Sequence, residues 1–430
     1  MSVKKPGKHL RSVSIVGVGC TPFTNFEDHP ETKGMSEGEA FGYAALEAIA
    51  DAGLEPRDVQ YFYHGAANPF MIGDSLTPNM QVAEWFGTRG IGSVHHSEAC
   101  CTGYVALQEA AMAVASGEFD VVLSGAVDLA ASLPVVNAPG CFRRDFPLEE
   151  MLPSIAMVYD RAYGRSLDSA FGISFDNWIN EYKNTYDLTN EQIDEALNAL
   201  SINLRRAAVL HPLGFYDQTY ADMAAANGMA TAEEFLTSMF NPKVTQYLRV
   251  SGFETKCDGA AAIVVMPTEL AIARGYDHKP IEVLGTGSAA YEGALPNNEY
   301  QGTRDGAAAI KEATGLTGAD CDLFMCNDFF LASEIGAAEE CGYIPRGEAW
   351  KYAIEGRTAY DGDRPINPHG GRCNFGHAHG ASGIADIYEA VKQMRGEAGP
   401  TQVKKVPETT MLRGFGGGQN VRVQIIRTVA

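Results

Sequence analysis

The sequence predicts an α/β protein built from two related halves. Apolar, β-branched runs alternate with helical segments, and segments of the second half repeat segments of the first. Alternating strands and helices are typical of parallel pairing and layered packing. The chain has 430 residues, of which 45% are hydrophobic and 20% charged, so it can bury a large core and exceeds the usual size of a single domain.

The first half contains clear start and stop signals. Ser36 is placed to cap a helix that Gly53 closes, and the Ala-rich segment after Cys101 is apolar nearly all round, which places it at the centre of the fold. The predicted elements in chain order are a strand over 12–19, a helix over 36–54, a strand over 59–68, a helix over 102–118 and a strand over 119–128.

The pattern loosens from about 130 to 246, where we expect an insertion with two helical segments over the core. A strand over 258–266 then restores the earlier pattern. Insertions of this kind usually shape a substrate pocket. The aromatic residues Phe215, Tyr216 and Tyr220 suit the wall of a wide pocket, and internal packing is the alternative.

An internal repeat relates the two halves. Gly53 and Asp58 of the first half match Gly315 and Asp320 of the second at a constant offset of 262. The repeat predicts two copies of one βαβ unit around a pseudo-twofold axis.

A second match pairs the turns that open a helix in each half, with Gly103 opposite Gly383. We therefore divide the chain into halves over 1–268 and 269–430, and expect the two helix starts to meet in the centre.

Composition excludes several classes of function. A net charge of −21 and the lack of clustered Lys and Arg exclude a nucleic-acid surface. The N-terminal segment lacks a long apolar core, and no run reaches the roughly 18 apolar residues of a membrane span, so we expect a cytoplasmic protein. The nine cysteines are scattered without a Cys-x-x-Cys pair, which predicts reduced thiols rather than disulfides or a zinc knuckle.

Two adjacent thiols, Cys100 and Cys101, lie in "SEACCTGY" where a loop becomes a helix. The positive end of a helix lowers the pKa of a thiol and makes it a nucleophile for acyl transfer. The alternative is that both thiols are small apolar packing groups.

The second half offers a partner for such a thiol. His377 and His379 lie in a Gly- and His-rich segment that we expect to form a loop before a helix, and a histidine facing a thiolate is an acid/base pair. For His379 the alternative is a polar loop residue satisfied by backbone. No metal is expected, because no third ligand lies at a recognised spacing.

The segment "RGFGGGQNVRVQII" has glycines that can approach a ligand closely and form an oxyanion hole, although such turns also commonly precede strands.

Five motifs together resemble the thiolase superfamily over nearly the whole chain. The resemblance implies a thiolase fold, with duplicated βαβαβαββ halves forming a five-layered α-β-α-β-α core and a loop-domain insertion. In chain order the motifs are Cys100 to Gly103, Asp258 to Ala261, Asn327 to Phe330, Gly376 to Gly383 and Gly416 to Gly418.

The resemblance also implies roles for individual residues. Cys100 is the nucleophile that becomes acylated, since Thr102 and Gly103 set the register of the motif, and His377 activates it. Asn327 helps to form the hole that stabilises the enolate. The amides of Gly416 and Cys100 form a second hole. Coenzyme A is expected as a co-substrate, with no permanently bound cofactor.

One departure from the family pattern affects the chemistry. Thiolases usually carry a second cysteine as acid/base, and the corresponding positions here are Gly414 and Phe329, which cannot move a proton. The replacement is left open among His379, Cys326, Cys373, His64 and a group from a partner.

The chain looks closest to the sterol-carrier-protein-like thiolase branch. This resemblance implies CoA-dependent cleavage of a bulky 3-oxoacyl-CoA, with aromatic esters such as benzoylsuccinyl-CoA among the expected substrates. It also implies a homodimeric core, with a small zinc-ribbon/OB-fold subunit that would give a heterotetramer and help to bind CoA. The alternatives are CoA-independent retro-aldol cleavage, another acyl transfer on a CoA ester, and a catalytically silent scaffold subunit.

Overall fold

The computed structural model describes residues 11–67, 77–83, 86–88, 90–131, 167–291, 300–417 and 420–429. The first half has the predicted βαβαβαββ order. Its elements are β1 (Val13–Cys20), α1 (Glu37–Asp51), β2 (Tyr61–Gly65), α2 (Pro78–Val82), β3 (Gly92–His96), α3 (Thr102–Ser116), β4 (Val122–Leu129) and β5 (Asp258–Pro267).

The second half repeats this order with one change. A parallel bridge between Phe324 and Ile366 stands where the first half has β3, and no full strand forms there among the described residues. After α9 (Thr268–Arg274), the elements are β6 (Ile281–Ala290), α10 (Gln301–Thr314), β7 (Leu323–Cys326), α11 (Leu331–Glu340), α12 (Ala349–Ile354), α13 (Gly371–Asn374), α14 (His379–Arg395), β8 (Thr409–Gly416) and β9 (Asn420–Thr428).

The strands join in the order β3-β2-β4-β5-β1-β6-β9-β8-β7. β1 meets β6 through two residue pairs. Outward from this junction, β5, β4 and β2 of the first half follow in the same order as β9, β8 and β7 of the second. β2 pairs in parallel with β3 and β4, and β7 with β8, whereas β1, β5, β6 and β9 pair antiparallel. The expectation of parallel pairing was therefore only partly right, because the last strand of each half runs antiparallel to the strand before it. β9 follows β8 directly, and β5 returns beside β4 after the long insertion.

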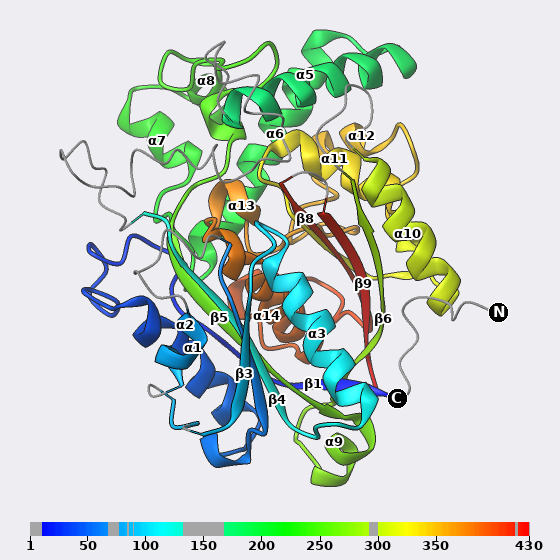
Figure 1. Cartoon of the computed structure of the whole chain (residues 1–430). Helices are drawn as coiled ribbons and strands as arrows, with labels where there is room; N and C mark the ends of the chain where they lie inside the picture. The colour runs from blue at the N-terminus through cyan, green and yellow to red at the C-terminus, as the bar shows by residue number, and fades with distance from the viewer. Residues whose placement is uncertain are drawn as a thin grey trace, which may run out of the picture.

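Two helices occupy the middle of the molecule. α14 contacts α3 and packs against β4, β5 and β1 of one half and β7 and β8 of the other. α1 covers the outer face of the first half and α10 that of the second (Figure 1). The five layers predicted from the family resemblance are confirmed, and the starts of α3 and α14 meet as the repeat predicted.

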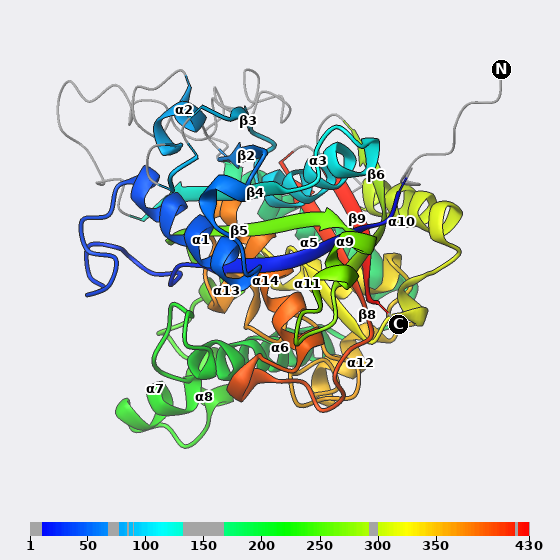
Figure 2. The same cartoon turned by 90° about the horizontal axis from the view of Figure 1, so that it is seen from below.

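The described part of the insertion contains four helices rather than the two expected. They are α5 (Leu167–Thr185), α6 (Asn190–Leu210), α7 (Tyr220–Ala226) and α8 (Ala232–Thr237). α7 and α8 lie at the opposite edge of the molecule from β2 and β3 (Figure 2). The stretch 132–166 of the expected insertion lies outside the described residues.

The aromatic residues of the insertion have packing partners. The Arg205 guanidinium lies 3.3 Å from the ring centre of Tyr216 and 4.4 Å from that of Tyr220, which is itself buried. Phe215 packs against the core of the central helices. These contacts support the packing alternative for all three. Within the described ranges, no helix combines the length and the apolar character needed to cross a membrane.

Candidate active site

Cys100 lies in a tight turn just before α3. Ala99 has a left-handed φ of 49°, and Cys101 is the N-cap of the helix. The Thr102 hydroxyl donates to the Ala99 carbonyl at 2.6 Å and accepts from the Glu98 amide at 2.9 Å. Thr102 therefore holds the turn that presents Cys100 ahead of the first helical residue.

Burial distinguishes the two adjacent thiols. Cys101 is fully buried in the core around the central helices, whereas Cys100 is partly exposed. Only a thiol that a substrate can reach is able to form a covalent intermediate, so Cys100 is the one suited to nucleophilic chemistry.

The structure does not support a lowered pKa for Cys100. Although Cys100 is partly exposed, the surrounding protein removes most of the water from its thiol, and this desolvation raises the pKa well above its ordinary value; the negative charge of Glu254 raises it further. The charge of Arg372 acts in the opposite direction but is outweighed. The expectation from the helix start was wrong in direction, because desolvation and a nearby carboxylate dominate. Cys100 therefore needs a base to lose its proton.

Gly416, at the end of β8, lies directly against the Cys100 turn. A Cβ at this position would lie 2.7 Å from the Glu98 carbonyl oxygen and 3.1 Å from the Cys101 Cβ. Only glycine allows this approach of the two backbones. The motif residue Gly418 lies outside the described residues.

His377 and His379 lie with their ring centres 4.8 Å apart. His377 is in the segment before α14, as expected, whereas His379 is the first residue of α14 rather than a loop residue. The Glu254 carboxylate joins them: its Oε2 lies 3.3 Å from His377 Nε2, and its Oε1 lies 3.4 Å from His379 Nε2.

Glu254 was not predicted as a site residue, because it lies 125 positions before His379. Its segment reaches the site by running beside the backbone that leads to His377. The Thr255 amide donates to the Arg372 carbonyl at 3.0 Å, and the His377 amide donates to the Thr255 carbonyl at 2.7 Å. No local motif in the sequence signals this pairing.

The two histidines have opposite pKa shifts. Burial lowers the pKa of His377 well below its ordinary value. Burial also acts to lower the pKa of His379, but a hydrogen bond to Glu254 and the charge of that carboxylate outweigh it, and the pKa rises. Glu254 itself is held ionised, because the histidines overcome the effect of burial and lower its pKa to about 2. The cluster thus pairs an imidazole whose pKa is lowered with one whose pKa is raised.

Asn327 is buried, and its side chain holds the local backbone. Its Nδ2 donates to the Phe415 carbonyl at 2.7 Å, and its Oδ1 accepts from the Phe329 amide at 3.1 Å. These bonds join the end of β7 to the end of β8 beside Gly416. A role in holding a water for the enolate remains a prediction.

The other acid/base candidates lie in different surroundings. Cys326 is buried beside Asn367, the thiol of Cys373 donates to the Asp328 carbonyl at 3.2 Å, and burial raises the pKa of both thiols. His64 is buried, with its Nδ1 2.8 Å from that of His95. Of the four, His379 is the one that contacts the His377–Glu254 pair.

Apolar packing fills the positions where thiolases usually carry a second cysteine. Phe329 stacks on Phe415 with ring centres 5.5 Å apart, and Gly414 lies under the ring of Tyr104. Neither position offers a proton donor.

A buried ion pair joins α13 and α14 near the site. Arg372 makes two hydrogen bonds to the Asp386 carboxylate, at 2.7 and 2.6 Å, and both side chains are fully buried. His369 and Tyr104 also contact this carboxylate. The network fixes α13 against α14.

Three side chains could together hold a metal ion. The donor atoms of Glu254, His377 and His379 all lie within 4.8 Å of one another. A metal was not expected because no third ligand lies at a recognised spacing. Glu254 supplies a third donor from a distant segment.

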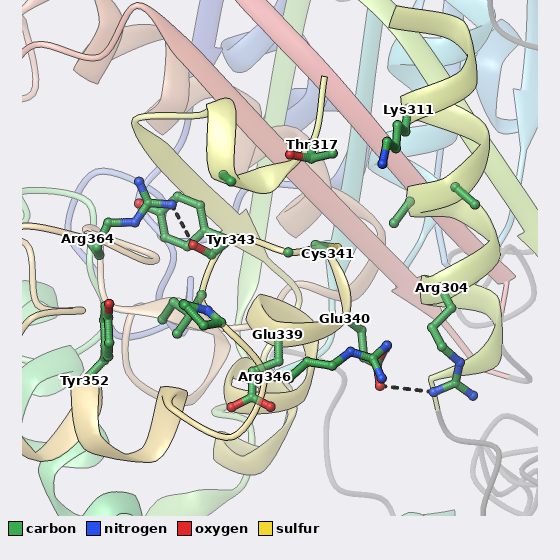
Figure 3. A pocket seen from close by; sticks show the side chains of 16 residues that line it. Arg304, Lys311, Thr317, Glu339, Glu340, Cys341, Tyr343, Arg346, Tyr352 and Arg364 are labelled. Carbon is green, nitrogen blue, oxygen red and sulfur yellow. Dashed lines mark hydrogen bonds and ion pairs between the residues drawn. The ribbon is translucent and has the colours of Figure 1, made fainter. Parts of the chain in front are cut away.

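A cavity of about 730 Å³ lies elsewhere, between α10 and the end of α11 (Figure 3). Arg304 and Arg346 share the Glu340 carboxylate at its rim, and Arg364 stacks on Tyr343. None of Cys100, His377 or Glu254 lines it. Its size alone does not make it the catalytic site, because the reactive groups lie beside the central helices.

Comparison with known proteins agrees with this fold and site. Residues 288–427 match the thiolase C-terminal domain-like family, and residues 64–138 match the N-terminal domain of beta-ketoacyl synthase. The chain is 27% identical to an acetyl-CoA acetyltransferase of Methanothermobacter thermautotrophicus, over 96% of this chain and 99% of that protein.

Two further relatives correspond to the expected branch. Sterol carrier protein 2 of Bos taurus is 26% identical over 94% of this chain and 70% of its own length. Benzoylsuccinyl-CoA thiolase subunit BbsB of Thauera aromatica is 26% identical over 96% of each chain.

A solved structure titled "Ltp2-ChsH2(DUF35) aldolase" has the same fold, with a TM-score of 0.73 and 23% identity over 97% of this chain and 98% of that one. With the duplicated core and the Cys100 turn, these matches identify the chain as a member of the thiolase superfamily.

Proposed function

We propose that this enzyme is a thiolase-type acyltransferase that cleaves a 3-oxoacyl-CoA with coenzyme A through an acyl-Cys100 intermediate. The observation that carries the proposal is the Glu254 carboxylate, which contacts both His377 and His379 and acts electrostatically on the Cys100 thiol. A nucleophile, a base and an acid are thereby gathered in one site.

In the first half-reaction the Cys100 thiol passes its proton to His377, and the sulfur attacks the 3-oxo carbon of the substrate. The bond between C2 and C3 breaks, and its electron pair becomes the enolate of the shortened acyl-CoA. His377 suits the base role because burial keeps its imidazole neutral. Glu254 then stabilises the imidazolium that forms, since opposite charges attract strongly in a buried site.

His379 takes the place of the missing second cysteine. It protonates the enolate, and in the second half-reaction it accepts the proton of coenzyme A while the CoA sulfur attacks the acyl-Cys100 carbonyl. The bond from the acyl carbon to Cys100 then breaks, and the departing thiolate recovers its proton from His377. The raised pKa of His379 favours a protonated ring at the start of the cycle. Two groups with pKa values shifted apart are the usual arrangement for acid and base roles in one site.

Gly416 and Asn327 support charge stabilisation. The Gly416 amide and the Cys100 amide would bind the oxyanion at the acyl-cysteine, and the contact of Gly416 with the Cys100 turn favours this arrangement. The Asn327 side chain donates to the Phe415 carbonyl and so holds the ends of β7 and β8 in place. The proposed enolate hole depends on this fixed backbone.

The substrate class is proposed from the relatives. BbsB is named as part of a benzoylsuccinyl-CoA thiolase, and sterol carrier protein 2 also matches over most of this chain. The name of BbsB supports a bulky 3-oxoacyl-CoA with an aromatic group, with coenzyme A as co-substrate.

A partner subunit and a homodimeric core belong to the same proposal. BbsB is named as a subunit, and the solved structure carries two component names in its title. β3 is one of the two edge strands of the described sheet, and its Val94 is 40% exposed, so this edge is suited to pair with a second copy. Two copies of a small zinc-ribbon/OB-fold subunit would form a heterotetramer with the homodimer. That subunit would bind the CoA phosphates, which the negative charge of this chain repels.

We also propose the division into halves at residues 268 and 269. β5 ends at Pro267, and the second half begins its sheet with Ile281.

Retro-aldol cleavage without free CoA is the second candidate. It is favoured by the raised pKa of Cys100 together with the absence of a second cysteine at Phe329 and Gly414. In that reaction the Glu254–histidine cluster would move protons and Cys100 would stay unmodified. A silent scaffold subunit would show neither activity.

The decisive experiment is intact-mass spectrometry after brief incubation with aliphatic and aromatic acyl-CoA thioesters. We expect a mass increase of one acyl group in the wild type and in Cys101→Ala, none in Cys100→Ala, and discharge of the adduct by free CoA. An unmodified wild type that still cleaves a 3-hydroxyacyl-CoA would establish the retro-aldol reaction instead. A chain that does neither, with or without candidate partners, would contradict both.

A further inference from the structure

We propose that Glu254, His377 and His379 form a binding site for a borderline divalent cation such as Zn²⁺. The site goes beyond acyl transfer and does not depend on which reaction the enzyme performs. It combines two imidazole nitrogens and one carboxylate, which are common ligands of Zn²⁺.

The spacing of the donor atoms suits a tetrahedral ion. The separations are 3.3 Å from His377 Nε2 to Glu254 Oε2 and 3.4 Å from His379 Nε2 to Glu254 Oε1. Bonds of about 2.0–2.1 Å in a tetrahedral site place neighbouring ligand atoms about 3.3–3.4 Å apart. All three residues offer donor atoms within 4.8 Å of one another, so small side-chain rotations bring them around one ion.

The surroundings of His377 leave one ring nitrogen available to an ion. His377 Nδ1 lies 2.9 Å from Ser382 Oγ, which also lies 3.2 Å from the Ala378 carbonyl, and the single hydroxyl proton can go to either acceptor. When Nδ1 donates to Ser382, the neutral ring offers its lone pair on Nε2. This atom is buried without a hydrogen-bond partner among the described residues, and it faces the carboxylate oxygen of Glu254.

In the tautomer with its lone pair on Nε2, a cation between this atom and the Glu254 carboxylate would bind both. In the other neutral tautomer Nε2 carries a proton, which a bound ion would displace. The bond from Nδ1 to Ser382 also orients the imidazole, as outer partners of metal-bound histidines do.

The surrounding charges do not exclude a cation. Glu254 and Asp128 contribute negative charge near His379, and Lys256 contributes positive charge. Arg372 is neutralised by its two-point contact with Asp386.

A bound ion would occupy the lone pair of His377 and displace the proton of His379 into solvent. Both groups would then be withdrawn from proton transfer. The site therefore predicts reversible inhibition by Zn²⁺, relieved by a chelator.

Binding is tested directly with Co²⁺, whose visible absorption reports its ligands. Tag-free protein is stripped with a chelator, titrated with Co²⁺ and then challenged with Zn²⁺. We expect one Co²⁺ per chain with the intense bands of a four- or five-coordinate ion, bleached by Zn²⁺. Glu254→Gln and His379→Ala should each weaken binding at least about tenfold, since even loss of an outer partner costs about 10–100-fold. The distant His29→Ala should bind as the wild type does.

The Cys100→Ala variant distinguishes Co²⁺ binding by Glu254, His377 and His379 from binding by the Cys100 thiol. Binding that survives in Cys100→Ala and depends on Glu254 and His379 supports the proposal. Weak octahedral bands in the wild type, or equal affinity in both ligand variants, would overturn it. Circular dichroism verifies that the variants fold. If neither variant folds, the Co²⁺ absorption spectrum of the wild type decides between a four- or five-coordinate site and an octahedral one. Acyl labelling of Cys100 is measured separately, so failure of the metal site leaves the proposed reaction untouched.

Discussion

Gly103 of α3 and Gly383 of α14, which occupy matching positions in the two halves of the sequence repeat, lie against each other at the centre of the molecule. A Cβ on Gly103 would lie 2.7 Å from the Gly383 Cα and 2.4 Å from the Ile384 amide nitrogen. The contact brings the two helix starts together, and with them the Cys100 turn and the His377 segment.

Gly103→Ala should destabilise the fold because the new Cβ meets backbone that cannot move aside alone. Overpacking of this kind costs about 1–3 kcal/mol in the free energy of unfolding. Urea unfolding measures the change. Gly252→Ala is the matched control, since its Cβ would lie 3.5 Å from Leu248 Cδ2, an ordinary contact distance. Equal stability of the two variants would show that α3 and α14 can separate without cost.

Asp386→Asn should be strongly destabilising because it leaves the charge of Arg372 buried without its partner. Breaking a buried pair in this way costs about 3–5 kcal/mol. Asp363→Asn removes the partner of Arg357 in an exposed pair, where the side chain of Asp363 is 63% exposed, and should cost less than about 1 kcal/mol. Guanidinium unfolding of both variants checks the contrast, and similar losses would mean that Arg372 finds another partner.

Glu254→Gln should reduce kcat/KM for the acyl-transfer reaction by roughly 10²–10⁴, the range expected when acid–base catalysis is lost. The amide keeps the shape of the side chain but has no negative charge to stabilise an imidazolium on His377 or to raise the pKa of His379. We expect kcat to fall more than KM rises, since the carboxylate acts on proton transfer. Glu269→Gln in α9 serves as the control. A Glu254→Gln enzyme with unchanged kcat would remove this carboxylate from the proposed mechanism.

The pH dependence of stability should include a contribution from Glu37. Burial raises the pKa of Glu37 to about 8, and the charge of Asp128 adds to the effect. Between the ordinary value of 4.5 and about 8, the folded state holds a proton that the unfolded state has lost. The free energy of unfolding therefore falls as the pH rises through this window.

Urea unfolding of the wild type and of Glu37→Gln at several pH values isolates this contribution. The variant should show a smaller decline in stability from pH 5 to pH 8, because its side chain cannot ionise. Parallel declines in both proteins would contradict the shift assigned to Glu37.

Local signals in the sequence were sufficient where neighbouring residues determine the structure. Ser36 caps α1 in a capping box with Glu39, as its position predicted. The turns ending at Asp58 and Asp320 recur at the predicted offset, as two short 3₁₀ helices. Pairing direction was harder to predict, because an alternating pattern does not show where two strands follow each other without a helix.

The family resemblance already selected Cys100 over Cys101, and the structure adds the physical reason, whereas the pKa of the nucleophile and the role of Glu254 needed three-dimensional information. Burial differs between the two thiols although they are adjacent. The pKa of Cys100 depends on desolvation and on a carboxylate more than 150 positions away, and these outweigh the helix start.

By itself the sequence determined the duplicated α/β architecture, the Cys100 motif before a central helix and the histidines of the second half, because turns, caps and hydrophobic periods are local properties. The tertiary structure alone decided which charged groups surround those residues. Glu254 contacts His377 and His379 only because its segment runs beside theirs, and electrostatic interactions depend on distance in space rather than on separation along the chain.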